Sequence, residues 1–188
     1  HLISPEELTS TISDRLARQS AVLVALDAAA AAAKRRWPNS WQSVFLKASP
    51  STPTTSISRH PGVHGWESIP CANMDIRRLR NEVVFPPGQA GFSYRAYSCR
   101  EGAYLPPRPL GPAPLVIVEG SYSHHPSLAP YYDIRIFVTC SPDEQARRLC
   151  RREGERYSNF VERWIPLEEG YFANYSIEEN AEMMVVTD

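Results

Sequence analysis

Lys34 is the residue of this chain whose position most clearly suggests chemistry. It ends a stretch, residues 21–34, in which an apolar run with two valines passes into six alanines and a lysine. A phosphate-binding loop has the pattern G-x-x-x-x-G-K-[ST] after a buried strand, and its backbone N–H groups and lysine bind phosphates. In that register Ala28 and Ala33 stand at the two glycine positions, and Arg35 replaces the hydroxyl residue.

The missing glycines leave two interpretations of this stretch open. Glycine permits backbone conformations that a Cβ disfavours, and the hydroxyl residue of the pattern would bind Mg²⁺. One interpretation is a degenerate phosphate loop that uses Ala28, Ala33, Lys34 and Arg35. The other is a buried strand followed directly by an alanine-rich helix.

Glu119 follows the second strongly apolar run, residues 115–118. Such a run predicts a strand buried on both faces of a parallel sheet. Open parallel sheets bind ligands at the carboxyl ends of their strands, and a carboxylate there can orient Mg²⁺ or its water. Glu119 is therefore a candidate metal ligand. The alternative is a carboxylate that only caps the end of the strand.

A helix rich in arginine is expected from Ser141-Pro142 onward, where serine and proline form a helix start. It carries four arginines: Arg147, Arg148, Arg151 and Arg152. Pairs one turn apart place like charges on one face, which destabilises a helix unless an anion bridges them. A phosphate would supply that anion. The alternative is a solvated helix whose arginines are balanced by Glu153 and Glu155.

Aromatic and basic residues alternate over residues 92–100, where Tyr94, Arg95, Tyr97 and Arg100 stand. Tyrosine rings can stack on a planar ligand, and guanidinium groups can donate hydrogen bonds to it. This pattern predicts a small-molecule pocket or, equally well, an edge strand or hairpin with no ligand.

The elements that would position these residues alternate between strands and helices. We expect helices over about 5–19, 74–84 and 142–158 and an aromatic helix over 160–175 interrupted at Pro166. Strands are expected over 21–27, 43–46, 115–119, 132–138 and 181–186. The order predicts an α/β fold in which a mainly parallel sheet of about five strands has helices on both faces. Prolines cluster between Pro50 and Pro114, so we expect a loop-rich insertion over about 47–112.

Composition limits the classes of protein to which this chain can belong. The chain of 188 residues predicts a single domain over 1–188, with 43% hydrophobic and 22% charged residues. A net charge of −1 predicts no binding to nucleic acid or to a membrane surface. No apolar run long enough for a membrane span and no signal peptide are visible, and the four cysteines form no C-x-x-C pair. We therefore expect a cytoplasmic protein.

From residue 92 onward, together with the stretch 22–34, the chain resembles the uridine kinase family of P-loop kinases, of the nucleoside kinase and phosphoribulokinase type. The segments that carry the resemblance are Phe-Ser-Tyr-Arg-Ala-Tyr-Ser-Cys-Arg (92–100), Val-Ile-Val-Glu-Gly-Ser-Tyr (116–122), Tyr-Tyr-Asp-Ile-Arg-Ile-Phe-Val (131–138), the arginines of 147–152, and Trp-Ile-Pro-Leu-Glu-Glu-Gly-Tyr-Phe (164–172). The resemblance implies a three-layer α/β/α sandwich of the P-loop NTPase type. It also implies transfer of the ATP γ-phosphate to a hydroxyl of a small molecule such as a nucleoside.

The resemblance assigns roles to the residues already singled out. Lys34 would contact the β- and γ-phosphates of ATP, Glu119 would lie at the Mg²⁺ side, and Arg151 would join them as a catalytic residue. The lid, about residues 142–158, would close over the nucleotide through Arg147, Arg148, Arg151 and Arg152. Tyr94, Arg95, Tyr97 and Arg100 would line the acceptor pocket.

Two departures from the family pattern support a second hypothesis. The loop lacks its glycines and its Ser/Thr, and the aspartate that the family has after the second strand is absent from residues 45–49. The leading hypothesis is a uridine kinase-like phosphotransferase that uses ATP and Mg²⁺. The alternative is a catalytically inactive nucleotide- or phosphate-binding protein with a kinase fold. Whether the chain forms homo-oligomers is left open.

Overall fold

The computed structural model describes residues 1–32, 43–47, 71, 74–84, 92–98, 101–110 and 113–188, and of residues 5, 43–47, 92 and 110 it describes the backbone alone. The strands are β1 (Val22–Ala28), β2 (Ser43–Lys47), β3 (Phe92–Tyr94), β4 (Tyr97–Ser98), β5 (Ala103–Tyr104), β6 (Arg108–Leu110), β7 (Leu115–Glu119), β8 (Ile134–Thr139) and β9 (Met183–Val186). The α-helices are α1 (Pro5–Leu16), α2 (Ile76–Leu79), α3 (Pro142–Glu153), α4 (Tyr157–Asn159), α5 (Ile165–Tyr175) and α6 (Ile177–Asn180). Among the described residues there are also two π-helical segments, Arg80–Val84 and Phe160–Trp164, and two 3₁₀ turns, Ala129–Tyr131 and Gly154–Arg156.

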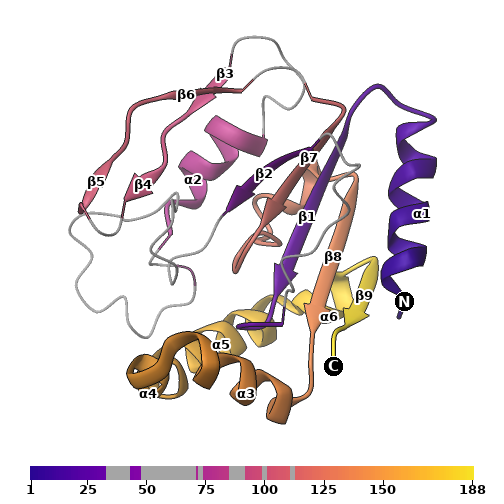
Figure 1. Ribbon diagram of the computed structural model, residues 1–188. Coiled ribbons are helices and arrows are strands. Elements are labelled where there is room, and N and C mark those ends of the chain that lie inside the picture. Colours follow the sequence, from indigo (N-terminus) through magenta and orange to yellow (C-terminus); the bar gives the residue numbers. More distant parts are fainter. Residues whose placement is uncertain (33–42, 48–70, 72–73, 85–91, 99–100, 111–112) are drawn as a thin grey trace.

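The strand β1 lies at the centre of a parallel sheet whose order is β2-β7-β1-β8-β9 (Figure 1). Every residue of β1 is buried, as expected for an apolar strand with neighbours on both sides. Four strands, β7, β1, β8 and β9, have described side chains, and β2 adds its backbone at the edge. The expected α/β fold with a parallel sheet is confirmed, and the count of about five strands is reached only when β2 is included.

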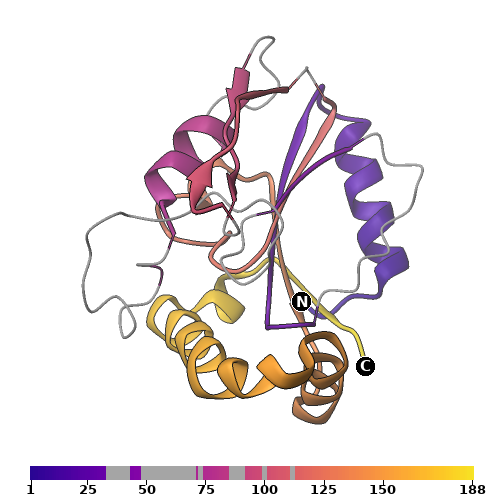
Figure 2. The ribbon, with the colours of Figure 1, turned by 60° about the vertical axis from the view of Figure 1, so that its left-hand side comes forward.

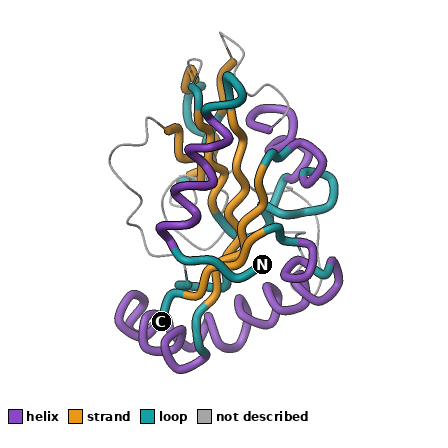
Figure 3. The backbone as a smooth tube through the Cα atoms, turned by 90° about the vertical axis from the view of Figure 1, so that its right-hand side faces the viewer, coloured by secondary structure: helices purple, strands orange, loops and turns teal. Residues whose placement is uncertain are grey.

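The two faces of the sheet are covered by different helices. Alternate residues of β1 and β8 pack against α1 through Leu8 and Ile12 on one face. The opposite residues pack against the α2 region and against α5, for example through Leu79 and Tyr171. Figure 2 shows α1 and α2 on opposite sides of the sheet. Figure 3 shows the helices that follow β8 gathered near the end of the sheet where β1 and β8 finish.

The helix α1 begins as the sequence predicts. The Ser4 hydroxyl accepts a hydrogen bond from the Glu7 N–H at 3.1 Å, and the Glu7 carboxylate accepts one from the Ser4 N–H at 2.7 Å, which together form a capping box. The helix ends at Leu16 rather than near residue 19.

The first residues of the chain lie along the outer edge of β9. The Ile3 N–H donates to the Met184 carbonyl at 2.9 Å, and the Met184 N–H donates to the His1 carbonyl at 2.8 Å. Leu2 thereby forms a parallel bridge with Met184. The N-terminal segment consequently covers the N–H and C=O of Met184 on the side of β9 that faces away from β8.

One expectation about local structure is wrong. The chain stays helical through Pro166: the π-helical segment Phe160–Trp164 continues directly into α5, whose first turn contains Pro166. The segment 92–98 forms strands, β3 pairing with β6 and β4 with β5, and much of the expected insertion 47–112 lies outside the described residues.

Candidate functional site

The alanine run begins as a tight turn at the carboxyl end of β1. The Ala29 N–H donates to the Val138 carbonyl at 3.1 Å, and the Ala32 N–H donates to the Ala29 carbonyl at 2.9 Å. Ala31 has a φ of 62°, a left-handed conformation that glycine adopts freely and alanine does not. Residues 29–32 therefore form a turn with a glycine-like backbone, and the interpretation of a helix starting directly after β1 is wrong for these residues.

Glu119 is the last residue of β7 and lies at the same carboxyl edge of the sheet as this turn. Its Cα pairs with Leu26 of β1 on one side and with Lys47 of β2 on the other. The side chain is half-buried, and the following Gly120 N–H donates to the Leu26 carbonyl at 3.0 Å. The expectation that β7 delivers an acid to the carboxyl edge is confirmed. Lys47, expected at the start of a loop, is instead the last residue of β2.

Asp27 is a second carboxylate at this edge, and sequence reasoning missed it. It is fully buried at the end of β1. Its carboxylate accepts hydrogen bonds from the Tyr171 hydroxyl at 2.7 Å, from the His124 N–H at 3.1 Å and from the Ala28 N–H at 3.0 Å. Burial raises the pKa of Asp27 to about 7, although these hydrogen bonds act in the opposite direction.

Glu168, on α5, is the third carboxylate near the turn. It is 7% exposed, and it accepts hydrogen bonds from the Ser121 hydroxyl at 2.5 Å and from the Ala30 N–H at 3.0 Å. Burial raises the pKa of Glu168 to about 7, opposed by the Ser121 hydrogen bond and reinforced by the charge of Asp27. The signal for its burial was the helical spacing that puts it on one face with Leu167 and Tyr171.

The arginines of α3 have different surroundings. Arg148 is buried, and its guanidinium donates to the Ala32 carbonyl at 3.1 Å, to the Ala31 carbonyl at 3.4 Å, and to the hydroxyl and carbonyl of Thr187. It also donates to the Glu144 carboxylate at 2.5 Å. Arg148 thus joins α3, the turn and the residue after β9, so its charge is already used within the protein.

The expected repulsion among the arginines is wrong, because carboxylates on the same helix pair with them. Glu144 accepts from Arg147 at 2.6 Å as well as from Arg148, and these hydrogen bonds lower the pKa of Glu144 to about 2. Glu153 pairs with Arg152 at 2.6 Å and with Arg156 at 3.3 Å. Arg151 is exposed, and no ion pair joins it to another residue that the structure describes.

The proposed acceptor residues lie on the two small sheets. Tyr97 is buried and packs edge-on against Tyr104, with ring centroids 5.2 Å apart. The Arg78 guanidinium lies over the Tyr104 ring at 4.0 Å, and that of exposed Arg95 lies at 5.5 Å. Tyr94 is half-buried in β3. These contacts form a cation–π cluster, and within the described part of the chain no hydrogen bond joins it to Asp27, Glu119 or Glu168.

Four of the predicted site residues lie outside the described part of the chain: Ala33, Lys34, Arg35 and Arg100. Their assignments stay predictions. Among the residues that are described, no group of three or more His, Cys, Asp or Glu could hold a metal ion, so Glu119 stands as a single carboxylate. The same part of the chain contains no helix that is long and apolar enough to cross a membrane.

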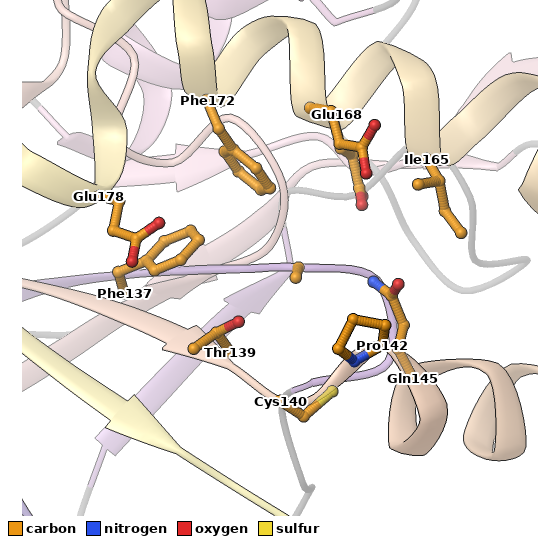
Figure 4. Close-up of a pocket in the computed structure, with 11 residues that line it drawn as sticks. Phe137, Thr139, Cys140, Pro142, Gln145, Ile165, Glu168, Phe172 and Glu178 are labelled. Atoms are coloured by element: carbon orange, nitrogen blue, oxygen red, sulfur yellow. The ribbon is translucent and has the colours of Figure 1, made fainter.

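A cavity of about 180 Å³ opens on the α5 side of the turn (Figure 4). It lies between Ala29, the end of β8, the start of α3, and α5. Figure 4 shows Phe137 and Phe172 on one side of it and Glu168 above, with Glu178 at its margin. Three of the lining residues are glutamates and none of the described ones is basic, so a polyphosphate would be repelled from this cavity.

Comparison with solved structures identifies a related fold. The structure described as a possible uridine kinase from Bacillus stearothermophilus matches with a TM-score of 0.61 and 13% sequence identity, over 97% of this chain and 100% of that one. This chain shares its overall fold with that structure. No protein-family model and no curated protein matches the sequence.

The shared fold places the turn where parallel α/β sheets bind ligands, which the sequence alone did not establish. In open parallel sheets, ligands bind beyond the carboxyl ends of the strands, where the strand order reverses. The turn 29–32 follows the central strand at that end, and Glu119 ends the neighbouring strand. The two features that the sequence predicted as a site therefore lie at the same edge of the sheet, whereas the tyrosines of β3 and β4 belong to a separate cluster.

Proposed function

We propose that the protein transfers the γ-phosphoryl group of ATP to a hydroxyl of a small molecule. The observation that carries this proposal is the turn after β1, left-handed at Ala31, at the same sheet edge as Glu119, in a P-loop kinase-like fold. Phosphoryl transfer requires little covalent chemistry from the protein, so positioning and charge neutralisation are its main contributions. A phosphate-binding turn at the same sheet edge as an acid is suited to both.

The residues fit ATP and Mg²⁺ in a specific way. The N–H groups of Ala28, Ala29, Ala30 and Ala32 already have acceptors inside the protein. Of the described turn, the Ala31 N–H is left to donate, so the phosphates would be held by it and by the residues that follow, Lys34 included. Glu119 would hold Mg²⁺, which prefers carboxylate oxygens and neutralises charge on the transferred phosphoryl group when bound.

The arginine helix would supply the remaining charge. Arg151 has an exposed side chain on α3 and no ion pair to another described residue, whereas Arg148 is occupied by the turn. We therefore assign Arg151 to the nucleotide and Arg148 to the fold. Arg147, which is paired with Glu144, and Arg152, which is paired with Glu153, would contribute only if those pairs separate.

The acceptor that we propose is a nucleoside. Support comes from the resemblance of residues 92–100 to the uridine kinase family and from the description of the matched structure as a possible uridine kinase. Tyr94, Arg95 and Tyr97, with Arg100, would contact it. Arg95 is exposed beside Tyr104, so its guanidinium can reach a ligand.

The test is phosphoryl transfer from γ-labelled ATP to a panel of nucleosides, with and without Mg²⁺. Lys34→Ala should weaken ATP binding, and Glu119→Gln should remove Mg²⁺-dependent turnover while the melting temperature stays unchanged. Glu169→Gln is the control, because Glu169 is exposed on α5 and makes no hydrogen bond to the described turn. Turnover that survives Glu119→Gln, or that is lost only because the variant unfolds, would contradict the assignment of Glu119.

A catalytically inactive nucleotide- or phosphate-binding protein is the second candidate. It is favoured by the Cβ atoms at every position of the turn and by the burial of Asp27, which is fully enclosed and cannot reach an acceptor hydroxyl. Equilibrium binding of ATP together with an absence of labelled product from every nucleoside in the panel would support this candidate over the kinase.

A further inference from the structure

The turn after β1 is held from outside by side chains of two helices. From α5, the Glu168 carboxylate accepts the Ala30 N–H at 3.0 Å. From α3, the Arg148 guanidinium donates to the carbonyls of Ala31 and Ala32. The helix α5 therefore binds the Ala30 N–H, and α3 binds the carbonyls of the next two residues.

These contacts hold the turn in a backbone conformation that alanine disfavours. Ala31 is left-handed at a φ of 62°, which its Cβ disfavours, so the local sequence does not favour this backbone by itself. Strained backbone persists only where surrounding structure over-determines it. Contacts from α3 and α5 lie on both sides of Ala31 and can impose what glycine would allow.

The Glu168 carboxylate is the better anchored of these groups. Both of its oxygens are used, since the second accepts the Ser121 hydroxyl at 2.5 Å, and the side chain is 7% exposed. Ser121 follows β7 by two residues, and three residues along α5 the Tyr171 hydroxyl donates to Asp27. Glu168 is thus tied to the ends of β1 and β7 at once.

We propose that Glu168 is a positioning residue for phosphate binding: it holds the Ala30 N–H toward the protein interior and so keeps the Ala31 N–H directed at the ligand. In this way a loop without glycines retains a phosphate-binding backbone. The proposal deepens the proposed function and rests on it for the identity of the ligand. The proposed role of Glu168 does not require direct contact between its carboxylate and phosphate.

The experiment compares four variants of the full chain with the parent. Glu168→Leu removes both accepted hydrogen bonds, whereas Glu168→Gln keeps a carbonyl for Ala30 and an amide for Ser121. Ala31→Gly is added to Glu168→Leu as a rescue, because glycine needs no clamp to adopt the left-handed conformation. Glu169→Leu is the matched control, since the neighbouring glutamate is exposed and makes no hydrogen bond to the described turn.

Two measurements are made on each variant. The first is the Kd for inorganic tripolyphosphate by calorimetry, and the second is hydrogen exchange of the Ala30 amide by NMR without ligand. We expect Glu168→Leu to weaken binding about tenfold, the effect of one lost hydrogen bond to a charged group, and to speed exchange at Ala30. Glu168→Gln and Glu169→Leu should match the parent, and Ala31→Gly should restore most of the lost affinity.

The outcomes separate this proposal from the proposed function. Tighter tripolyphosphate binding by Glu168→Leu would mean that the carboxylate competes with phosphate, which overturns the proposal. Unchanged exchange at Ala30 in Glu168→Leu also overturns it. If the parent binds no tripolyphosphate, the proposed function fails, and Ala30 exchange still decides whether Glu168 holds the turn. Should Glu168→Leu fail to fold, Ser121→Ala, which removes one donor to Glu168, must speed Ala30 exchange for the proposal to stand.

Discussion

Replacing Arg148 by methionine tests whether the arginine helix serves the fold or the ligand. Methionine keeps most of the length and apolar surface of the side chain but donates no hydrogen bond. The guanidinium is buried and donates to the carbonyls of Ala31, Ala32 and Thr187 and to the Thr187 hydroxyl. We expect Arg148→Met to destabilise the protein without ligand.

The magnitude follows from which acceptors lose their partner. The Ala32 carbonyl keeps the Thr187 hydroxyl at 2.6 Å, so it remains satisfied. The carbonyls of Thr187 and Ala31 lose a charged donor, and the Ala31 bond is long at 3.4 Å. An orphaned buried acceptor costs about 1–3 kcal/mol, so the free energy of unfolding should fall by about 2–3 kcal/mol. For a chain of this size that is a fall of about 5–10 °C in melting temperature.

The assay is urea unfolding followed by far-UV circular dichroism, with the ATP affinity measured in parallel. Arg151→Met is the matched control, because Arg151 is exposed on the same helix, and surface substitutions of this kind change stability by less than about 0.5 kcal/mol. Equal stability of the two variants, combined with loss of ATP affinity only in Arg148→Met, would refute the structural role and return Arg148 to the nucleotide site.

Three further substitutions test the turn and its support. Ala31→Gly should raise the free energy of unfolding by up to about 1 kcal/mol, because relief of the left-handed strain is partly offset by the greater freedom of glycine in the unfolded chain. Thermal unfolding measures this change, and a melting temperature below that of the parent would contradict the prediction. Burial raises the pKa of Asp27 and of Glu168 from 3.8 and 4.5 to about 7, so the folded state binds these protons more tightly and stability should fall as the pH rises from about 4 to 7. Glu168→Gln should remove up to about 3 kcal/mol of that fall, seen in urea unfolding at pH 4 and pH 8, and an unchanged pH dependence would show that Glu168 is not the group that titrates. Leu149→Ala should cost about 2–5 kcal/mol because Leu149 is fully buried against Ala30 and Phe160, whereas Leu2→Ala, at an exposed side chain, should cost little in the same assay.

The strands of the main sheet could be predicted because each is an apolar run bounded by polar residues. Residues 22–28 and 115–119 are buried along nearly their whole length, and the acid that ends the second run lies at the expected edge. The capping box at Ser4 and Glu7 is likewise local, so it was readable without tertiary information.

The partners of the interior charged residues could not be predicted, because they come from parts of the chain that are far apart in the sequence. Asp27 ends an apolar strand and Glu168 lies in an aromatic helix, and only the fold brings them to the same turn. Arg147 and Arg148 are adjacent and alike in sequence, yet one is exposed and the other buried. The strands β3 to β6 are two or three residues long, so their pairing depends on contacts rather than on pattern.

The segment formed by residues 1–3 has a consequence for how the protein behaves in concentrated solution. An uncovered edge strand offers its free backbone groups to the strands of other molecules and promotes aggregation. Here the backbone of His1 and Ile3 occupies the groups of Met184 that face away from β8. The side chain of Val186 is exposed close to this edge, so the strand would be apolar as well as open if the segment were absent. Residues 1–3, which are far from β9 in the sequence, therefore cover the Met184 part of this edge, and we expect that their removal would promote association between sheets.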